Sequence, residues 1–252
     1  SAEAAASAAA EEIRVAPEFL DITLPQARAK NLSFGAGDLV VIGVPTYAGR
    51  VPNKIMPFIR DGISGKGAVG VPVVTYGNRS ADDSLMELYL LMRDAGFRVP
   101  GGGAFVCQHA FAHSLAADRP DREDREKARE LGREALLKAE ADCLREVHFP
   151  GRSPVGPYYV PKGVDGNPAV FLKARPKRDA SRCTACGTCA KCSPIGSIGE
   201  DYETAAICIK CQACIRKCPA QARFFDDAAF LSHKAMLEQS CRSVCRKSEI
   251  YL

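Results

Sequence analysis

Apolar runs and amphipathic segments alternate along the first half of the chain. Residues 38–45 and 71–76 are apolar almost throughout and are bounded by Gly or Pro, as buried strands are. Residues 53–61 predict a short helix. Residues 81–95 predict an amphipathic helix, because two acidic residues near its start suit a helix amino terminus.

Weaker patterns surround these segments. Residues 1–13 are rich in Ala and Glu and predict a helix, and residues 19–24 predict a short strand. A further strand is expected over residues 97–106, interrupted by three glycines, and a long charged helix over residues 121–146. Strands separated by helices of this length favour a parallel α/β sheet with helices on both faces.

Composition divides the chain into four parts. We expect an α/β domain over residues 1–148 and a linker rich in Pro and Gly over residues 149–181. A small α+β domain with most of the cysteines is expected over residues 182–225, followed by a helix and tail over residues 226–252.

Overall composition excludes few functions. The 252 residues are 46% hydrophobic and 25% charged, which is ordinary for a globular protein. A net charge of +4 without a basic stripe does not indicate nucleic-acid binding. We also expect no membrane span, because no apolar run approaches the roughly 20 residues that cross a bilayer.

Cysteine usage is more informative. The chain has 12 cysteines, and eight of them fall between Cys183 and Cys218. Such crowding at short, regular spacings is typical of a metal site. It predicts a reducing compartment, and hence a cytoplasmic protein.

The cysteines form two runs of the type Cys-x2-Cys-x2-Cys. The second run continues through three residues to Cys218 and Pro219, which is the spacing of bacterial two-cluster ferredoxins. Zinc sites use separated Cys-x2-Cys pairs, which this pattern fits poorly. We therefore expect two [4Fe–4S] clusters. One would be bound by Cys183, Cys186, Cys189 and Cys218, and the other by Cys208, Cys211, Cys214 and a ligand from the first run.

That last ligand departs from the ferredoxin spacing. The usual position, just before Pro194, holds Ser193, and Cys192 lies one residue early. Cys192 is the preferred ligand, because soft thiolate suits cluster iron better than an alcohol oxygen. Ligation by Ser193 and a cluster with three protein ligands are the alternatives.

The first domain resembles flavodoxin-like domains that are fused in one chain to a two-cluster ferredoxin. The resemblance covers nearly the whole chain and rests on the loops at residues 43–52 and 75–79 and on their order before the cysteines. It implies a flavodoxin-like fold in which these loops border FMN. It also implies that Tyr47 or Tyr76 lies against a face of the flavin ring. The implied FMN contacts are Thr46, Tyr47, Ala48, Gly49, Arg50, Tyr76, Gly77, Asn78 and Arg79.

The start of the chain departs from this family. Flavodoxin-like proteins begin with a central strand and a loop that binds the FMN phosphate, and both are absent here. We expect a gap in the sheet, with unpaired backbone groups, and a sequence that is shortened relative to the natural protein. Without the phosphate anchor, we do not expect tight FMN binding by this chain.

These features predict a cytoplasmic electron-transfer protein that exchanges electrons with redox partner proteins through two [4Fe–4S] clusters, coupled to FMN. Such a chain could be a flavin and iron–sulfur oxidoreductase. The alternative is a non-catalytic iron–sulfur carrier whose flavodoxin-like domain no longer binds FMN and serves as a docking module. The sequence does not fix the oligomeric state.

Overall fold

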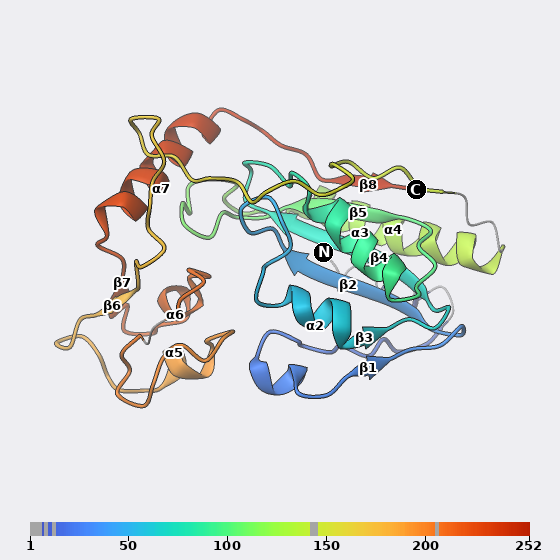
Figure 1. Ribbon diagram of the computed structural model, residues 1–252, viewed down its shortest axis with the longest axis horizontal. Helices are drawn as coiled ribbons and strands as arrows, with labels where there is room; N and C mark the ends of the chain where they lie inside the picture. Colours follow the sequence, from blue (N-terminus) through green and yellow to red (C-terminus); the bar gives the residue numbers. More distant parts are fainter. Residues whose placement is uncertain (1–6, 8–9, 12–13, 142–145, 205–206) are drawn as a thin grey trace.

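The computed structural model describes the chain except residues 1–6, 8–9, 12–13, 142–145 and 205–206 (Figure 1). Most of the helix expected over residues 1–13 lies outside the described residues, as does the end of the helix expected over residues 121–146. None of the described helices is both long enough and apolar enough to cross a membrane.

A mixed four-stranded sheet forms the centre of the larger part. Its order is β2 (Leu39–Pro45), β4 (Val69–Tyr76), β5 (Gly102–Val106) and β8 (Glu249–Tyr251). The first three strands are parallel, whereas β8 pairs antiparallel with β5. The strands expected over residues 38–45 and 71–76 are therefore confirmed as β2 and β4.

Helices cover both faces of this sheet, as the strand and helix pattern predicted (Figure 1). On one face, α2 (Met56–Asp61) and α3 (Ser84–Asp94) pack with alternate residues of β2 and β4. On the other face, α4 (Arg122–Glu140) packs through Ala128, Leu131 and Ala135. The chain is thus an α/β protein in which a sheet lies between two helical layers.

A second, two-stranded parallel sheet lies apart from the first. It pairs β1 (Leu32–Ser33) with β3 (Ile63–Ser64) and shares no ladder with β2. The prediction of a strand over residues 19–24 was wrong. This segment has no neighbouring strand among the described residues, and it leads directly into the 3-10 helix η1 (Pro25–Arg28).

Close backbone approach explains the glycines of β5. The strand expected over residues 97–106 is reduced to Gly102–Val106, and two of the glycines lie inside it. A Cβ atom on Gly102 would lie 2.7 Å from the carbonyl oxygen of Pro72 in β4. Glycine therefore continues this strand where a larger residue would collide.

The cysteine-rich part is built from short elements (Figure 1). An antiparallel pair, β6 (Lys177–Arg178) and β7 (Arg223–Phe224), closes it at both ends. Between these strands lie α5 (Thr188–Lys191) and α6 (Ala213–Arg216), and α7 (Ala228–Cys241) follows. After α7 the chain returns to the sheet as β8, which the sequence did not predict because three residues carry no readable alternation.

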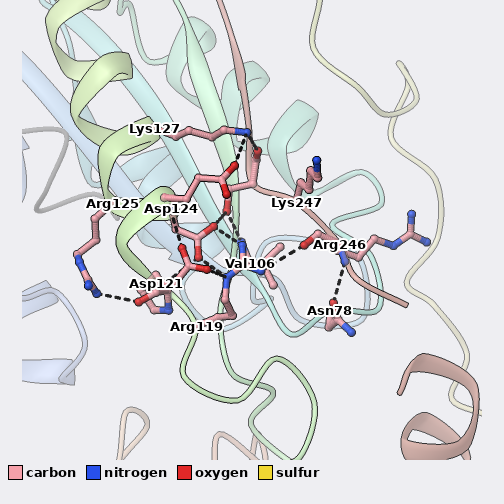
Figure 2. A network of polar contacts seen from close by, with 12 residues as sticks. Asn78, Val106, Arg119, Asp121, Asp124, Arg125, Lys127, Arg246 and Lys247 are labelled. Carbon is pink, nitrogen blue, oxygen red and sulfur yellow. Dashed lines mark hydrogen bonds and ion pairs between the residues drawn. The ribbon is translucent and has the colours of Figure 1, made fainter. Parts of the chain in front are cut away.

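A buried polar network fastens this returning segment to the sheet (Figure 2). The carboxylate of Asp124, 1% exposed, accepts hydrogen bonds from Nε and Nη2 along one edge of the Arg119 guanidinium. It also accepts a hydrogen bond of 2.5 Å from the hydroxyl of Ser248, which in turn accepts one of 2.9 Å from the amide of Val106 in β5. The amino end of α4 and the residue before β8 are therefore held together.

This network makes stability depend on pH. Burial by itself would raise the pKa of Asp124, but the hydrogen bonds from Arg119 and Ser248 outweigh it and lower the pKa from 3.8 to about 2. Because the folded-state pKa is below the unfolded value, the stabilisation is present above about pH 4 and is lost as the pH falls toward 2.

We expect Asp124→Asn to lower the free energy of unfolding at neutral pH by about 3 kcal/mol, because it leaves Arg119 without its buried partner. The variant should also lose part of the acid dependence below about pH 4. Urea titrations at several pH values measure both effects. The control is Glu123→Gln on the same helix turn, a 72% exposed residue whose loss should cost less than about 1 kcal/mol. Equal losses in the two variants would contradict the assignment.

Candidate functional site

The two groups of cysteines line two separate small cavities. The first cavity is lined by Cys183, Cys186, Cys189 and Cys218. The second is lined by Cys208, Cys211 and Cys214. Seven of the eight expected ligands are divided between the cavities as the spacing predicts, including the crossing of Cys218 from the second run to the first cavity.

The backbone follows the same path in both runs. Ala185 and Lys210 occupy equivalent positions and have φ values of 53° and 55°. Two residues later, Gly187 and Gln212 have φ values of 72° and 64°, and each immediately precedes a short helix. A left-handed backbone conformation costs free energy for residues other than glycine. Their recurrence at matched positions indicates that each run wraps around one centre.

The same repeat identifies which residue of the first run corresponds to Cys218 of the second run. Its equivalent in the first half is Ser193, which lines the second cavity and is 8% exposed. The amide of Ala222 donates to the Cys218 sulfur at 3.2 Å, and the amide of Ser197 donates to the Ser193 hydroxyl at 2.9 Å. Ser193 thus has the position and the hydrogen bond that a fourth cysteine would have.

Cys192, the ligand that the sequence analysis preferred, does not share the position of Ser193. It is not among the residues that line either cavity, and its thiol is 3.5 Å from the carbonyl oxygen of Cys189. It is nevertheless close enough to Cys211 to affect the pKa of that thiol. The local geometry therefore favours Ser193 over Cys192 at the second cavity.

At the second cavity, burial is the main cause of the shifted pKa values of the thiols. It raises the pKa of Cys211, and it raises the pKa of Cys214 to about 12. In the first cavity Cys186 is exposed, and the Thr188 hydroxyl, 3.3 Å away, lowers the pKa of its thiol. Thiolate ligands at the second cavity would therefore form only when bound metal displaces their protons.

Arg223 is a buried cation between the two cavities that the sequence analysis missed. It is 3% exposed and lines the first cavity, and its charge partly offsets the effect of burial on the pKa of Cys214 in the second. The guanidinium donates to the carbonyl oxygen of Tyr202 at 2.5 Å and to the hydroxyl of Thr204 at 2.6 Å. A buried positive charge suits a site that gathers thiolates. Nothing in the local sequence distinguished Arg223 from the other basic residues.

The described thiols do not form a preassembled site for a single metal ion. Within the described ranges, no three His, Cys, Asp or Glu side chains converge on one point that could hold an ion. The eleven described cysteines are all free thiols, and Cys143 lies outside the described residues. A single zinc ion needs four ligands around one point, whereas a cubane binds each thiolate at a different iron.

The two loops expected to contact flavin lie at the carboxyl ends of β2 and β4, on the side of the sheet nearest the cysteines (Figure 1). The Tyr47 hydroxyl lies near Cys211 and Cys208. Burial first, and then the charge of these two thiols, raise the pKa of Tyr47. The loop at residues 46–50 therefore lies within electrostatic range of two thiols of the second cavity, although it does not line that cavity.

The charged side chains of these loops make contacts within the chain. Arg50 forms an ion pair of 2.5 Å with Glu87, and its guanidinium lies 4.8 Å from the ring centre of Tyr158 in the linker. Arg79 pairs with Asp82 and lies 4.1 Å from the ring centre of Tyr159. The linker thus packs on the loops through these two tyrosines.

Three further residues of the predicted flavin set contact neighbouring segments of the chain. The Thr46 hydroxyl is 2.7 Å from that of Ser84, and the Tyr76 hydroxyl donates to the carbonyl oxygen of Lys247 at 3.2 Å. Asn78, 5% exposed, donates at 2.7 Å to the carbonyl oxygen of Val244 and accepts from the amide of Arg246 at 3.2 Å. Tyr76 and Asn78 therefore hold the returning carboxyl-terminal segment.

Several backbone amides of the loops have no acceptor. Within the part of the chain that the structure describes, five amides of the predicted flavin set donate no hydrogen bond: those of Ala48, Gly49, Gly77, Asn78 and Arg79. Two of these residues, Gly49 and Asn78, are buried. Positive φ values at Ala48, Gly49 and Asn78 turn the backbone sharply at these positions.

Comparison with known proteins leaves the family open. No protein-family model matches the chain, and no curated protein matches it. Function therefore has to be argued from the site itself.

We expect Asn78→Ala to loosen the carboxyl-terminal segment, because the change leaves the buried carbonyl group of Cys241 and the partly buried carbonyl of Val244 and amide of Arg246 without their side-chain partner. The cost should be about 2 kcal/mol of unfolding free energy. Amide hydrogen exchange should accelerate in residues 244–251, and Asn167→Ala, at an exposed loop residue, is the control. Unchanged exchange in this segment would show that Asn78 does not hold it.

Proposed function

We propose that this protein transfers electrons through two [4Fe–4S] clusters. The observation that carries the proposal is the repeated left-handed backbone around two cavities, each lined by one set of cysteines with ferredoxin spacing. When bound, such clusters each take up and release one electron. The residues of this chain would hold them, set the distance between them and limit the access of water.

The surroundings of the cysteines support cluster binding. The amide of Lys210 donates to the Cys208 sulfur at 3.3 Å, and the amide of Ala222 to the Cys218 sulfur at 3.2 Å. Amide hydrogen bonds to sulfur and the nearby charge of Arg223 both stabilise the reduced, more negative cluster. These contacts are the means by which the protein would adjust the two reduction potentials.

We further propose that the larger part is a flavodoxin-like domain that can place FMN beside the second cluster. The amides that donate no hydrogen bond within the described residues, in the two loops at the carboxyl ends of β2 and β4, support this proposal. So does the position of Tyr47 near Cys208 and Cys211, because a flavin at this loop would be a close neighbour of the cluster. The chain would then connect a two-electron flavin to one-electron carriers.

The second candidate is an iron–sulfur carrier without flavin, in which the larger part serves as a docking module. The internal contacts favour it: Arg50 and Arg79 are engaged with acidic residues and linker tyrosines, and Asn78 holds the carboxyl-terminal segment. Flavin would have to bind through backbone amides alone or displace these contacts.

Cofactor analysis separates the two candidates. Protein purified without oxygen should contain about eight iron and eight sulfide per chain. FMN bound in a one-to-one ratio after addition supports the coupled protein, whereas no binding supports the carrier. Zinc in place of iron, or no metal, would refute both.

Two alanine variants test the ligand assignment. Cys211→Ala should lose about half of the iron, because it removes one ligand of the second cluster. Cys245→Ala is the matched control, since Cys245 is an exposed thiol that lines neither cavity. Equal iron contents in the two variants would contradict the assignment.

The fourth ligand of the second cluster has its own test. Hard oxygen binds cluster iron less firmly than thiolate, so Ser193→Cys should slow the loss of iron in air several-fold and alter the electron paramagnetic resonance of one cluster. Cys192→Ala should leave both measurements unchanged. If Cys192→Ala instead removes the second cluster, Cys192 rather than Ser193 is the ligand.

A further inference from the structure

Arg223 has one hydrogen-bonding group without a partner. Its Nε atom is buried, and no group in the described part of the chain accepts a hydrogen bond from it. Among the described residues, no other buried side-chain nitrogen or oxygen atom is in this state. Buried donors in folded proteins are almost always paired, so this exception needs a specific explanation.

The guanidinium of Arg223 is bonded only to neutral groups of the described residues. They are the carbonyl oxygens of Tyr202 and Pro176, at 2.5 and 3.4 Å, and the hydroxyl of Thr204, at 2.6 Å. Arg223 itself is 3% exposed, so water contributes little to the solvation of its charge. A buried cation is costly unless a negative charge lies close to it. These surroundings therefore suit an anionic group beside the free Nε–H.

The same three partners place the guanidinium between the two cysteine cavities. Tyr202, which accepts from Nη1, lines the first cavity. Pro176 and Thr204, which accept from Nη2, line the second cavity. The donors of a guanidinium have a fixed geometry, in which Nε and Nη2 share one edge. The unpartnered Nε–H is therefore directed to the side of the second cavity.

Cys214 is the thiol of the second cavity whose surroundings match this donor. It is 8% exposed, and the helix that carries it, α6, contacts the strand β7 that carries Arg223. Burial raises the pKa of the Cys214 thiol, and the positive charge of Arg223 is the largest opposing effect. Hydrogen bonds to an ionised acceptor are stronger than those to a neutral one. The Nε–H group thus suits the thiolate form of Cys214 better than the thiol form.

The internal repeat shows that this cation belongs to one half of the cysteine-rich part. Ser193 is the equivalent of Cys218, and the position that follows Ser193 as Arg223 follows Cys218 holds Ile198. Ile198 is buried and apolar. The two cavities therefore differ in their electrostatic surroundings, although the backbone follows the same path around both.

We propose that Arg223 is a positioning residue for the second cluster, whose Nε–H donates a hydrogen bond to the Cys214 sulfur when this sulfur is bound to iron. The inference rests on the proposed electron-transfer function and deepens it. A hydrogen bond to a ligand sulfur and a nearby positive charge both stabilise the reduced form of a cluster. Because Nε is directed to the second cavity, Arg223 raises the reduction potential of the second cluster more than that of the first.

Redox titration of the whole, iron-loaded chain tests this assignment. Electron paramagnetic resonance follows each cluster, and the signal that is missing from Cys211→Ala identifies the second one. Arg223→Met should still hold about eight iron. It should change the ratio of reduced to oxidised second cluster about tenfold, which lowers its potential by about 59 mV. The potential of the first cluster should fall by less.

Two further variants separate the hydrogen bond from the charge. Arg223→Lys keeps a positive charge but has no Nε–H group, so it should lower the potential of the second cluster by a smaller amount. It should also change the paramagnetic resonance spectrum of that cluster. Lys177→Met, in the neighbouring strand β6, removes a 64% exposed cation and is the control. It should leave both potentials unchanged, because solvent and salt screen an exposed charge.

The outcomes distinguish this inference from the proposed function. If both Arg223 variants hold eight iron and leave the potential and spectrum of the second cluster unchanged, the inference is overturned and electron transfer still stands. Equal shifts of both clusters in Arg223→Met would also overturn it, because a general effect of charge would then suffice. Should Arg223→Met fail to hold iron, Arg223→Lys decides by the same measurements. No iron in the unsubstituted protein would refute the proposed function, and this inference with it.

Discussion

The parallel ladder between β2 and β4 is the interaction on which the rest of the structure depends. Both helical layers pack on side chains that alternate along these two strands, so each face of the ladder supports one core. The carboxyl ends of the same strands carry the loops that lie next to the cysteines. The outer edge of β2 has no neighbouring strand among the described residues. One ladder therefore positions the core, the candidate site and the open edge.

The cysteine-rich part has a different source of order. Its helices α5 and α6 have four residues each and bury only Cys214 between them. Short helices of this kind are not stable by themselves. The repeated left-handed turns and the buried Arg223 arrange the thiols around two centres, and binding of metal there would contribute folding free energy directly. The same residues would then provide both stability and redox chemistry.

The returning carboxyl-terminal segment joins these two parts. It leaves α7 beside the cysteine-rich part, contacts Asn78, and enters the sheet as β8 next to Ser248. Asp124 and Arg119 fix it there through buried, charge-assisted hydrogen bonds (Figure 2). Because Asn78 belongs to a loop beside the candidate site, the geometry of that loop and the docking of the segment are mechanically connected.

Local pattern alone determined much of this architecture. Continuous apolar runs identified β2 and β4, because strands buried on both faces need apolar residues throughout. Cysteine spacing identified the two groups that line separate cavities, because three closely spaced thiols can reach one centre, and in the ferredoxin spacing the cysteine before proline belongs to the other centre. For the fourth ligand of the second group it favoured Cys192, because thiolate is softer than an alcohol oxygen. The backbone repeat and the amide of Ser197, which donates to the Ser193 hydroxyl, favour Ser193 instead.

Contacts between distant segments decided the rest. β8 is too short to show a pattern and exists because β5 offers it a ladder, whereas residues 19–24 have strand-like residues but no described strand to pair with. The roles of Arg223, Asp124 and Asn78 likewise come from burial beside remote partners. A local sequence pattern indicates which helix, strand or turn a segment can form. Desolvation and strand pairing depend on what the fold brings alongside, and only the tertiary structure supplies that.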